Sequence, residues 1–128
     1  MTVHLPYTKA TSNILSRRRL ESMRRGAFLI NTCRGEVLDE PALYDLLSSG
    51  RIAGAALDVY HQEPYQGPLR NLPNVFLCCH QGSCSFDGRY AMEMQSAENA
   101  VAFARGDAIS PERIVWLPGM AAPAVEFY

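Results

Sequence analysis

The sequence lacks the features that mark several specialised protein classes. Its four cysteines form no C-x-x-C pair and no spacing typical of zinc ligands, so we expect no metal site. Its apolar runs are far shorter than the roughly 20 residues that span a bilayer. A net charge of −1 provides no bulk attraction to nucleic acid or to acidic membranes. Because no signal peptide is visible either, we expect a protein of the reducing cytoplasm.

What the sequence does contain is a regular alternation of short apolar runs with helical patterns. Its 128 residues are enough for a single core. The apolar runs predict strands at residues 2–5, 27–32, 53–59 and 74–79. Helices are predicted from Ser16 to Gly26, over residues 40–49 behind the capping residue Asp39, and over residues 87–105. This order predicts an α/β fold with a parallel sheet.

Polar side chains follow three of the predicted strands. Arg34 follows the strand at 27–32, Asp58 and Glu63 follow the apolar residues 54–57 of the third strand, and His80 follows the fourth. Each of them alone has an ordinary reading as a loop or strand-end residue. Because the carboxyl ends of parallel strands meet at one edge, where ligands of such sheets bind, their joint occurrence favours a functional site. A guanidinium can bind the carboxylate of a substrate, and an imidazole paired with an acidic side chain can transfer protons. Together these groups suit the oxidation of an alcohol that lies next to a carboxylate in the substrate.

Three segments resemble one enzyme family in particular. The stretches "MRRGAFLINTCRGEVLDEPALYDLLSSGRIAGAALDVYHQEP" and "PLRNLPNVFLCCH", preceded by "VHLPYT", are similar to the signature region of NAD-dependent D-2-hydroxyacid dehydrogenases. The resemblance extends to about Ala104. It implies a Rossmann-like parallel sheet, here the second half of a dinucleotide-binding domain, followed by a long helix. It also implies NAD as the cofactor, with NADP not excluded, and a small 2-hydroxy or 2-oxo acid as the substrate.

The resemblance assigns roles to matching positions. It implies that Arg34 binds substrate and takes part in catalysis, that His80 is the general acid/base, and that Glu63 is the partner of His80. The cofactor contacts that it implies are at Pro6, Thr32, Cys33, Arg34, Asp58, His80, Gly82 and Ser83.

The sequence also departs from the family pattern. Cys78 and Cys79 stand where the family usually has Thr-Pro, Gln81 stands where it has an apolar residue, and these changes affect the expected shape of the substrate pocket. No G-x-G-x-x-G occurs anywhere in the chain. We therefore expect a carboxyl-terminal portion of such an enzyme, inactive alone, with residues 1–106 as a partial NAD(P)-binding domain. Residues 107–128 would be a tail that packs on an absent substrate domain, and the complete protein would be a homodimer.

Two other readings of the sequence remain. The C-terminal-binding protein corepressors share this dehydrogenase framework, and in that reading the chain would be a nuclear, NAD-sensing binding protein. Those corepressors favour Trp three residues after the histidine, whereas this chain has Ser83, which favours the enzyme. The third reading is a fragment without any activity. The arginine-rich helix at residues 17–25 is interpreted as a solvated face rather than a nucleic-acid site.

Overall fold

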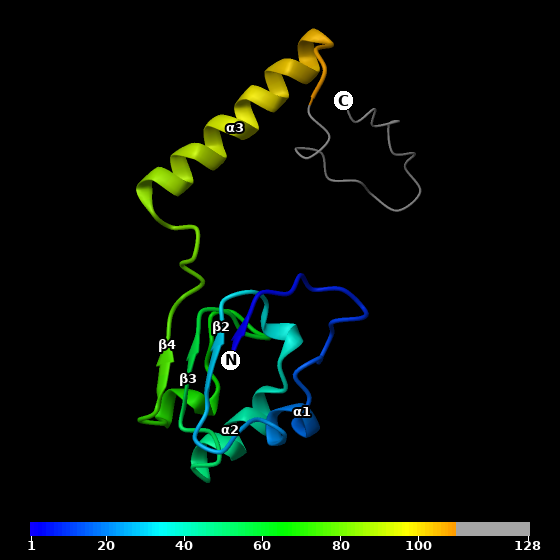
Figure 1. Cartoon of the computed structure of the whole chain (residues 1–128). Coiled ribbons are helices and arrows are strands. Elements are labelled where there is room, and N and C mark those ends of the chain that lie inside the picture. The colour runs from blue at the N-terminus through cyan, green and yellow to red at the C-terminus, as the bar shows by residue number, and fades with distance from the viewer. Residues whose placement is uncertain (110–128) are drawn as a thin grey trace. The chain divides into compact units, whose positions relative to one another are not determined.

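The structure is a computed structural model, and it describes residues 1–109. Within these residues the fold consists of four strands and three α-helices. Figure 1 shows how the chain runs through them. The strands are β1 (Thr2–Val3), β2 (Phe28–Asn31), β3 (Gly54–Leu57) and β4 (Val75–Leu77), and the α-helices are α1 (Arg17–Glu21), α2 (Glu40–Ser48) and α3 (Phe86–Arg105). Two single-turn 3₁₀ helices, η1 (Gly35–Val37) and η2 (Pro68–Asn71), lie in the connections.

The four strands form one parallel sheet in the order β1-β2-β3-β4. The register aligns Asn31 at the end of β2 with Leu57 at the end of β3, and Leu57 with Leu77 at the end of β4. The carboxyl ends of these strands therefore lie side by side at one edge. The parallel sheet predicted from the alternating pattern is confirmed.

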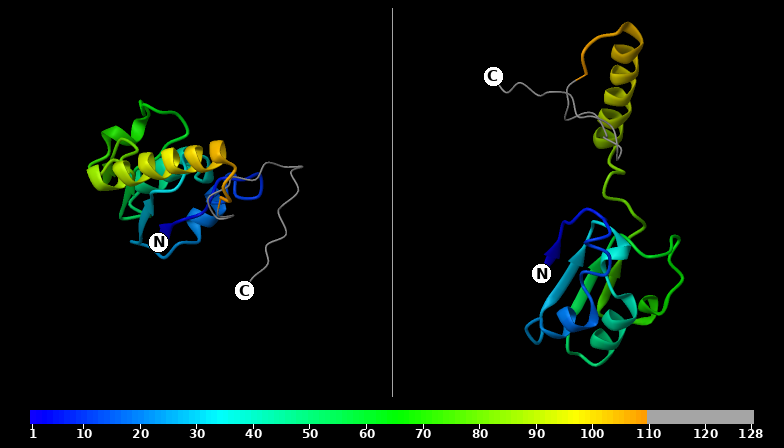
Figure 2. Two further views of the ribbon diagram at one scale, coloured as in Figure 1. Left: turned by 90° about the horizontal axis from the view of Figure 1, so that it is seen from above. Right: turned by 90° about the vertical axis from the view of Figure 1, so that its right-hand side faces the viewer.

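Helices α1 and α2 cover one face of this sheet (Figure 2). Leucines from both helices and from the strands fill the space between the layers, and the fully enclosed ones include Leu20, Leu29, Leu43 and Leu57. The side chain of Asp39 accepts a hydrogen bond from the Ala42 amide at 2.9 Å and so caps α2 as predicted. The core on this face is what holds the strand ends in place.

The opposite face of the sheet carries large apolar side chains that remain exposed within the described residues. Phe28, Ile30 and Phe76 are 63%, 42% and 68% exposed. Along β2, the exposed Phe28 and Ile30 alternate with the buried Leu29 and Asn31, as expected for a strand with one covered face. Parallel sheets ordinarily bury both faces, so this face has the character of a surface that another protein segment covers.

The first helix is shorter than its sequence predicts. Gly26 does adopt a left-handed conformation, with φ of 77°, but α1 ends at Glu21. The guanidinium of Arg51 donates hydrogen bonds to the carbonyl oxygens of Glu21 and Met23, both at 2.6 Å. Because those carbonyls are satisfied by a side chain distant in sequence, the helix does not need another turn.

The described chain divides into two compact units, one of which comprises residues 1–83 and the other begins at Cys84. In the second unit, Ser85 caps α3 by accepting a hydrogen bond from the Gly88 amide at 3.1 Å, and Gly106 ends the helix with φ of 73°. Among the described helices, none is long and apolar enough to cross a membrane. The predicted tail at 107–128 lies mostly outside the described residues, and its packing on another domain stays a prediction.

Candidate functional site

The turn after β2 is organised by a buried asparagine. The side-chain oxygen of Asn31 accepts hydrogen bonds from the amide and the thiol of Cys33, at 3.1 and 3.0 Å, and its side-chain nitrogen donates to the Arg34 carbonyl at 3.0 Å. Asn31 itself is fully buried. It fixes the backbone from which Arg34 extends. The Arg34 side chain is exposed and donates to the Cys33 carbonyl at 2.7 Å.

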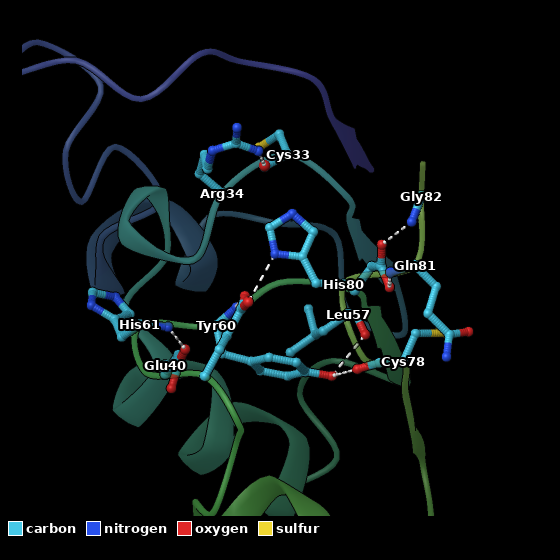
Figure 3. A network of polar contacts seen from close by, with 12 residues as sticks. Cys33, Arg34, Glu40, Leu57, Tyr60, His61, Cys78, His80, Gln81 and Gly82 are labelled. Atoms are coloured by element: carbon cyan, nitrogen blue, oxygen red, sulfur yellow. Dashed lines mark hydrogen bonds and ion pairs between the residues drawn. The ribbon is translucent and has the colours of Figure 1, made fainter. Parts of the chain in front are cut away.

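The end of β3 contacts the loop that follows β4. The backbone carbonyl of Asp58 accepts a hydrogen bond from the His80 amide at 2.9 Å. Its carboxylate oxygens accept from the amides of Gln81 and Gly82, at 2.8 and 2.9 Å (Figure 3). Asp58 is only 7% exposed, and burial of a carboxylate is costly, but the hydrogen bonds from these two amides offset that cost. Asp58 thus contacts two other predicted site residues, His80 and Gly82.

Glu63 and His80 form an ion pair at the carboxyl edge of the sheet. Glu63 Oε2 lies 2.8 Å from His80 Nδ1, and the other carboxylate oxygen accepts a hydrogen bond from the Tyr60 amide at 3.1 Å. The side chains of Glu63 and His80 are 36% and 44% exposed, so the pair is accessible to a small molecule. Because the carboxylate binds Nδ1, it fixes the orientation of the imidazole ring.

The contacts of Glu63 change its acidity. The hydrogen bond to His80 is the largest cause that lowers the pKa of Glu63, followed among the lowering causes by the Tyr60 amide and the charge of His80. Partial burial and the nearby charge of Asp58 act in the opposite direction, and the net result is a pKa below the ordinary value. Glu63 is therefore held ionised beside the imidazole.

Tyr60 joins the ends of β3 and β4. Its hydroxyl lies 2.9 Å from the Leu57 carbonyl and 2.7 Å from the Cys78 carbonyl, and its ring stacks on Tyr65 with ring centroids 4.5 Å apart. Burial is the main cause that raises the pKa of Tyr60 to about 12, with the neighbouring Cys78, Cys79 and Asp58 adding to it. The hydroxyl stays protonated and tethers the two strand ends that carry Asp58 and His80.

We expect the carboxyl pKa of Glu63 to rise toward its ordinary value when His80 is replaced by alanine. The depressed pKa means that this pair stabilises the fold above the ordinary carboxyl range, and that the stabilisation is lost as pH falls through the folded-state pKa. Carboxyl-detected NMR titration measures the change. His61→Ala is the matched control, because His61 contacts Glu40 and Leu38 instead. An unchanged Glu63 pKa in the His80 variant would contradict the pairing.

The other predicted contacts lie at the same end of the sheet but form no comparable network within the described residues. The Pro6 carbonyl accepts a hydrogen bond from the Thr11 hydroxyl at 2.6 Å, and Thr32 and Ser83 are exposed. Arg34 and the imidazole of His80 are both seen at this edge in Figure 3, but the hydrogen bond described for the Arg34 side chain stays within its own turn. The catalytic and cofactor roles of the predicted residues stay predictions.

Sequence reasoning missed three residues that build the site, namely Asn31, Gly35 and Tyr60. Asn31 has a local signal, since an asparagine that closes an apolar strand often hydrogen-bonds the next turn. Gly35 has none: a Cβ placed there would lie 2.0 Å from the Tyr60 carbonyl carbon. Only the fold reveals that the turn carrying Arg34 rests directly on the segment that carries Tyr60.

A largely apolar cavity of about 530 Å³ adjoins the ion pair. Glu63 lies in its wall together with Tyr60, Tyr65, Arg70 and Cys78, but neither His80 nor Arg34 does. The cavity therefore lies on the Glu63 side of the pair.

The chain is similar to known proteins in both sequence and fold. Residues 1–82 match the family model described as D-isomer specific 2-hydroxyacid dehydrogenase, NAD binding domain. The glyoxylate reductase of Korarchaeum cryptofilum is 44% identical over 109 residues, which are 84% of this chain and 33% of the reductase. A crystal structure of a glyoxylate reductase from Paecilomyes thermophila superposes with a TM-score of 0.79 at 32% identity, covering 88% of this chain and 36% of that one.

A third relative was solved with a cofactor. The D-isomer specific 2-hydroxyacid dehydrogenase from Xanthobacter autotrophicus Py2, in complex with NADPH and MES, has a TM-score of 0.71 at 37% identity over 88% of this chain and 48% of that one. The chain spans about one third of the length of the curated reductase that it matches. On this evidence it belongs to the D-isomer specific 2-hydroxyacid dehydrogenase family, through the NAD binding domain of that family.

Proposed function

We propose that this chain supplies the proton-transfer and substrate-binding edge of an NAD(P)-dependent oxidoreductase that acts on the CH–OH group of a D-2-hydroxyacid. The single observation that carries the proposal is the Glu63–His80 pair, 2.8 Å apart and accessible at the carboxyl edge of a parallel sheet. Ligands of open α/β sheets bind at this edge. Membership in the dehydrogenase family supports the same reaction class.

In this proposal each of the three polar residues has one task. His80 removes the hydroxyl proton of the 2-hydroxyacid, or donates a proton to the carbonyl oxygen of the 2-oxo acid in the reverse direction. The ionised Glu63 stabilises the imidazolium and fixes the ring orientation. Arg34 binds the substrate carboxylate through its guanidinium.

We propose that the described residues contact the nicotinamide end of a dinucleotide cofactor. Two observations support this: the Glu63–His80 pair and exposed loop backbone lie together at the sheet edge, and the chain contains no G-x-G-x-x-G to bind a pyrophosphate. A bound nicotinamide cofactor, NAD or NADP, supplies or accepts the hydride. The residues proposed to contact it are Pro6, Thr32, Cys33, Arg34, Asp58, His80, Gly82 and Ser83.

The substrate proposed for the complete protein is a small 2-oxo acid such as glyoxylate. The relatives reported above with 44% and 32% identity are named as glyoxylate reductases. Their names, together with Ser83 in place of the corepressor tryptophan, favour the enzyme over a corepressor. We further propose a cytoplasmic homodimer for the complete protein, and we expect this chain to be inactive alone because it lacks the glycine-rich turn.

A chimeric enzyme tests the proposed function. In it, residues 1–109 of this chain replace the homologous segment of the Korarchaeum cryptofilum reductase, which supplies the remaining residues. We expect glyoxylate-dependent oxidation of NADH or NADPH, monitored by the absorbance of the reduced cofactor, with the parental reductase as the reference. A folded chimera that binds the reduced cofactor but reduces neither glyoxylate nor a larger 2-oxo acid would refute the proposal.

A further inference from the structure

The backbone of His80 has an unusual conformation. Its φ is 54°, in the left-handed region that non-glycine residues seldom adopt and that persists only where surrounding contacts impose it. This conformation determines the direction in which the imidazole leaves the chain toward Glu63. The contacts that impose it therefore control the geometry of the ion pair.

Asp58 holds the backbone at His80 and at the two residues that follow it. Three consecutive backbone amides, those of His80, Gln81 and Gly82, donate to the carbonyl and the two carboxylate oxygens of this one residue, at 2.9, 2.8 and 2.9 Å. The buried carboxylate, bound to two successive amides, fixes the chain just after His80, at Gln81 and Gly82. The carbonyl fixes the chain at the amide of His80 itself.

The same short segment also holds the other half of the pair. Two residues after Asp58, the Tyr60 amide donates to Glu63 Oε1 at 3.1 Å, which leaves Oε2 for His80. The Tyr60 hydroxyl, between the Leu57 and Cys78 carbonyls, keeps the ends of β3 and β4 together. Residues 58–60 thus position both His80 and Glu63.

We propose that Asp58 is a positioning residue, whose carboxylate holds His80 in its left-handed conformation and thereby aligns the imidazole with Glu63. This role adds to the cofactor contact proposed above, and it rests on the proposed function only for the reaction that His80 performs. It acts through hydrogen bonds to the backbone rather than through the charge of Asp58.

Asp58 could act on Glu63 through its charge or by positioning His80, and these two roles predict opposite changes in the pKa of Glu63 when Asp58 is removed. The negative charge of Asp58 raises the pKa of Glu63, whereas the hydrogen bond from His80 lowers it and is the largest cause. If Asp58 acted by charge alone, its removal would lower the pKa of Glu63 further. If it positions His80, its removal weakens the pair and raises the pKa of Glu63. The sign of one measured shift separates the two roles.

The test is a carboxyl NMR titration of the full chain with Asp58→Asn and Asp58→Ala. Asparagine retains one acceptor oxygen, so we expect a partial rise of the Glu63 pKa, and alanine removes both acceptors, so we expect a larger rise. If the alanine variant does not fold, the asparagine variant decides by itself. An unchanged or lowered Glu63 pKa in a folded asparagine variant overturns the proposal.

Asp39→Ala provides the matched control. Asp39 is also an aspartate whose two carboxylate oxygens accept backbone amides, from Ala42 at 2.9 Å and from Arg17 at 3.3 Å, but these belong to α2 and α1. We expect it to lower the stability of the chain without raising the pKa of Glu63. An equal rise in this control would show that general loosening of the fold, and not the positioning of His80, causes the shift. Because the titration requires no turnover, failure of the proposed enzyme activity leaves its outcome intact.

Discussion

In the chimeric enzyme, replacing His80 with alanine is expected to lower kcat by about 10²–10⁴-fold, the usual contribution of a positioned general acid or base. The loss falls on proton transfer, since the imidazole is the group that the Glu63 carboxylate orients at 2.8 Å. Cofactor affinity should change little, because the pyrophosphate of the cofactor is bound by the part of the chimera that comes from the reductase. Steady-state kinetics with glyoxylate and fluorescence titration with NADH measure the two quantities.

His61→Ala is again the appropriate control for this experiment. His61 lies only two residues before Glu63, and its ring nitrogen Nε2 contacts the Leu38 carbonyl at 2.7 Å rather than the ion pair. We expect kcat within a few-fold of the unmodified chimera. A His80 variant that retains the full kcat of the chimera would exclude the acid/base role, whatever the cofactor affinity.

The largest effect on stability is expected for Gly35→Ala. A Cβ at this position would lie 2.0, 2.2 and 2.4 Å from the Tyr60 carbonyl carbon, the Tyr60 oxygen and the His61 nitrogen. All three are backbone atoms, which no rotamer change can move aside. We expect the free energy of unfolding to fall by about 3 kcal/mol or more, the upper range for overpacking a dense interior. Urea denaturation of the chain measures the loss.

Gly50→Ala separates this clash from the general cost of replacing a glycine. Gly50 has φ of 69°, and a Cβ there would meet no atom within 4 Å. Only the left-handed backbone is strained, so we expect a loss of about 1–2 kcal/mol. If Gly35→Ala costs no more than Gly50→Ala, the turn after Arg34 is not packed against the Tyr60 segment as described.

Most strands and helices could be predicted from the sequence, because the patterns that mark them lie within the elements themselves. The capping residue Asp39 marks a helix whose hydrogen bonds are made within a few residues, and each apolar run marks a strand by its own composition, although the strand pairs with a segment distant in sequence. The end of α1 was misplaced because Arg51, about 30 residues later in the chain, satisfies the carbonyl of Glu21, the last residue of the helix, and that of Met23 just beyond it. No pattern within the helix itself could have indicated that partner.

The site shows the same division between local and long-range causes. Family resemblance placed Glu63 and His80 as partners, and the structure does bring them together. The contacts that hold them were not predicted, because Asp58, although itself a predicted site residue, reaches amides 23 and 24 residues away, and Gly35 matters only for the space that it leaves to Tyr60. Such contacts exist only after the strands have aligned their ends.

Residues 58–60 anchor both partners of the pair, since Asp58 holds the chain at His80 and the Tyr60 amide holds Glu63, and this limits how the region can change in length. One inserted or deleted residue there would disconnect the anchor of His80 from the anchor of Glu63, because the two anchors are spaced by the chain itself. Insertions after Tyr65 break neither anchor, since Gln66 and the residues that follow it lie outside both and beyond the ring that stacks on Tyr60. Length variation among functional descendants of this sequence should therefore accumulate after Tyr65 and be absent between Asp58 and Glu63.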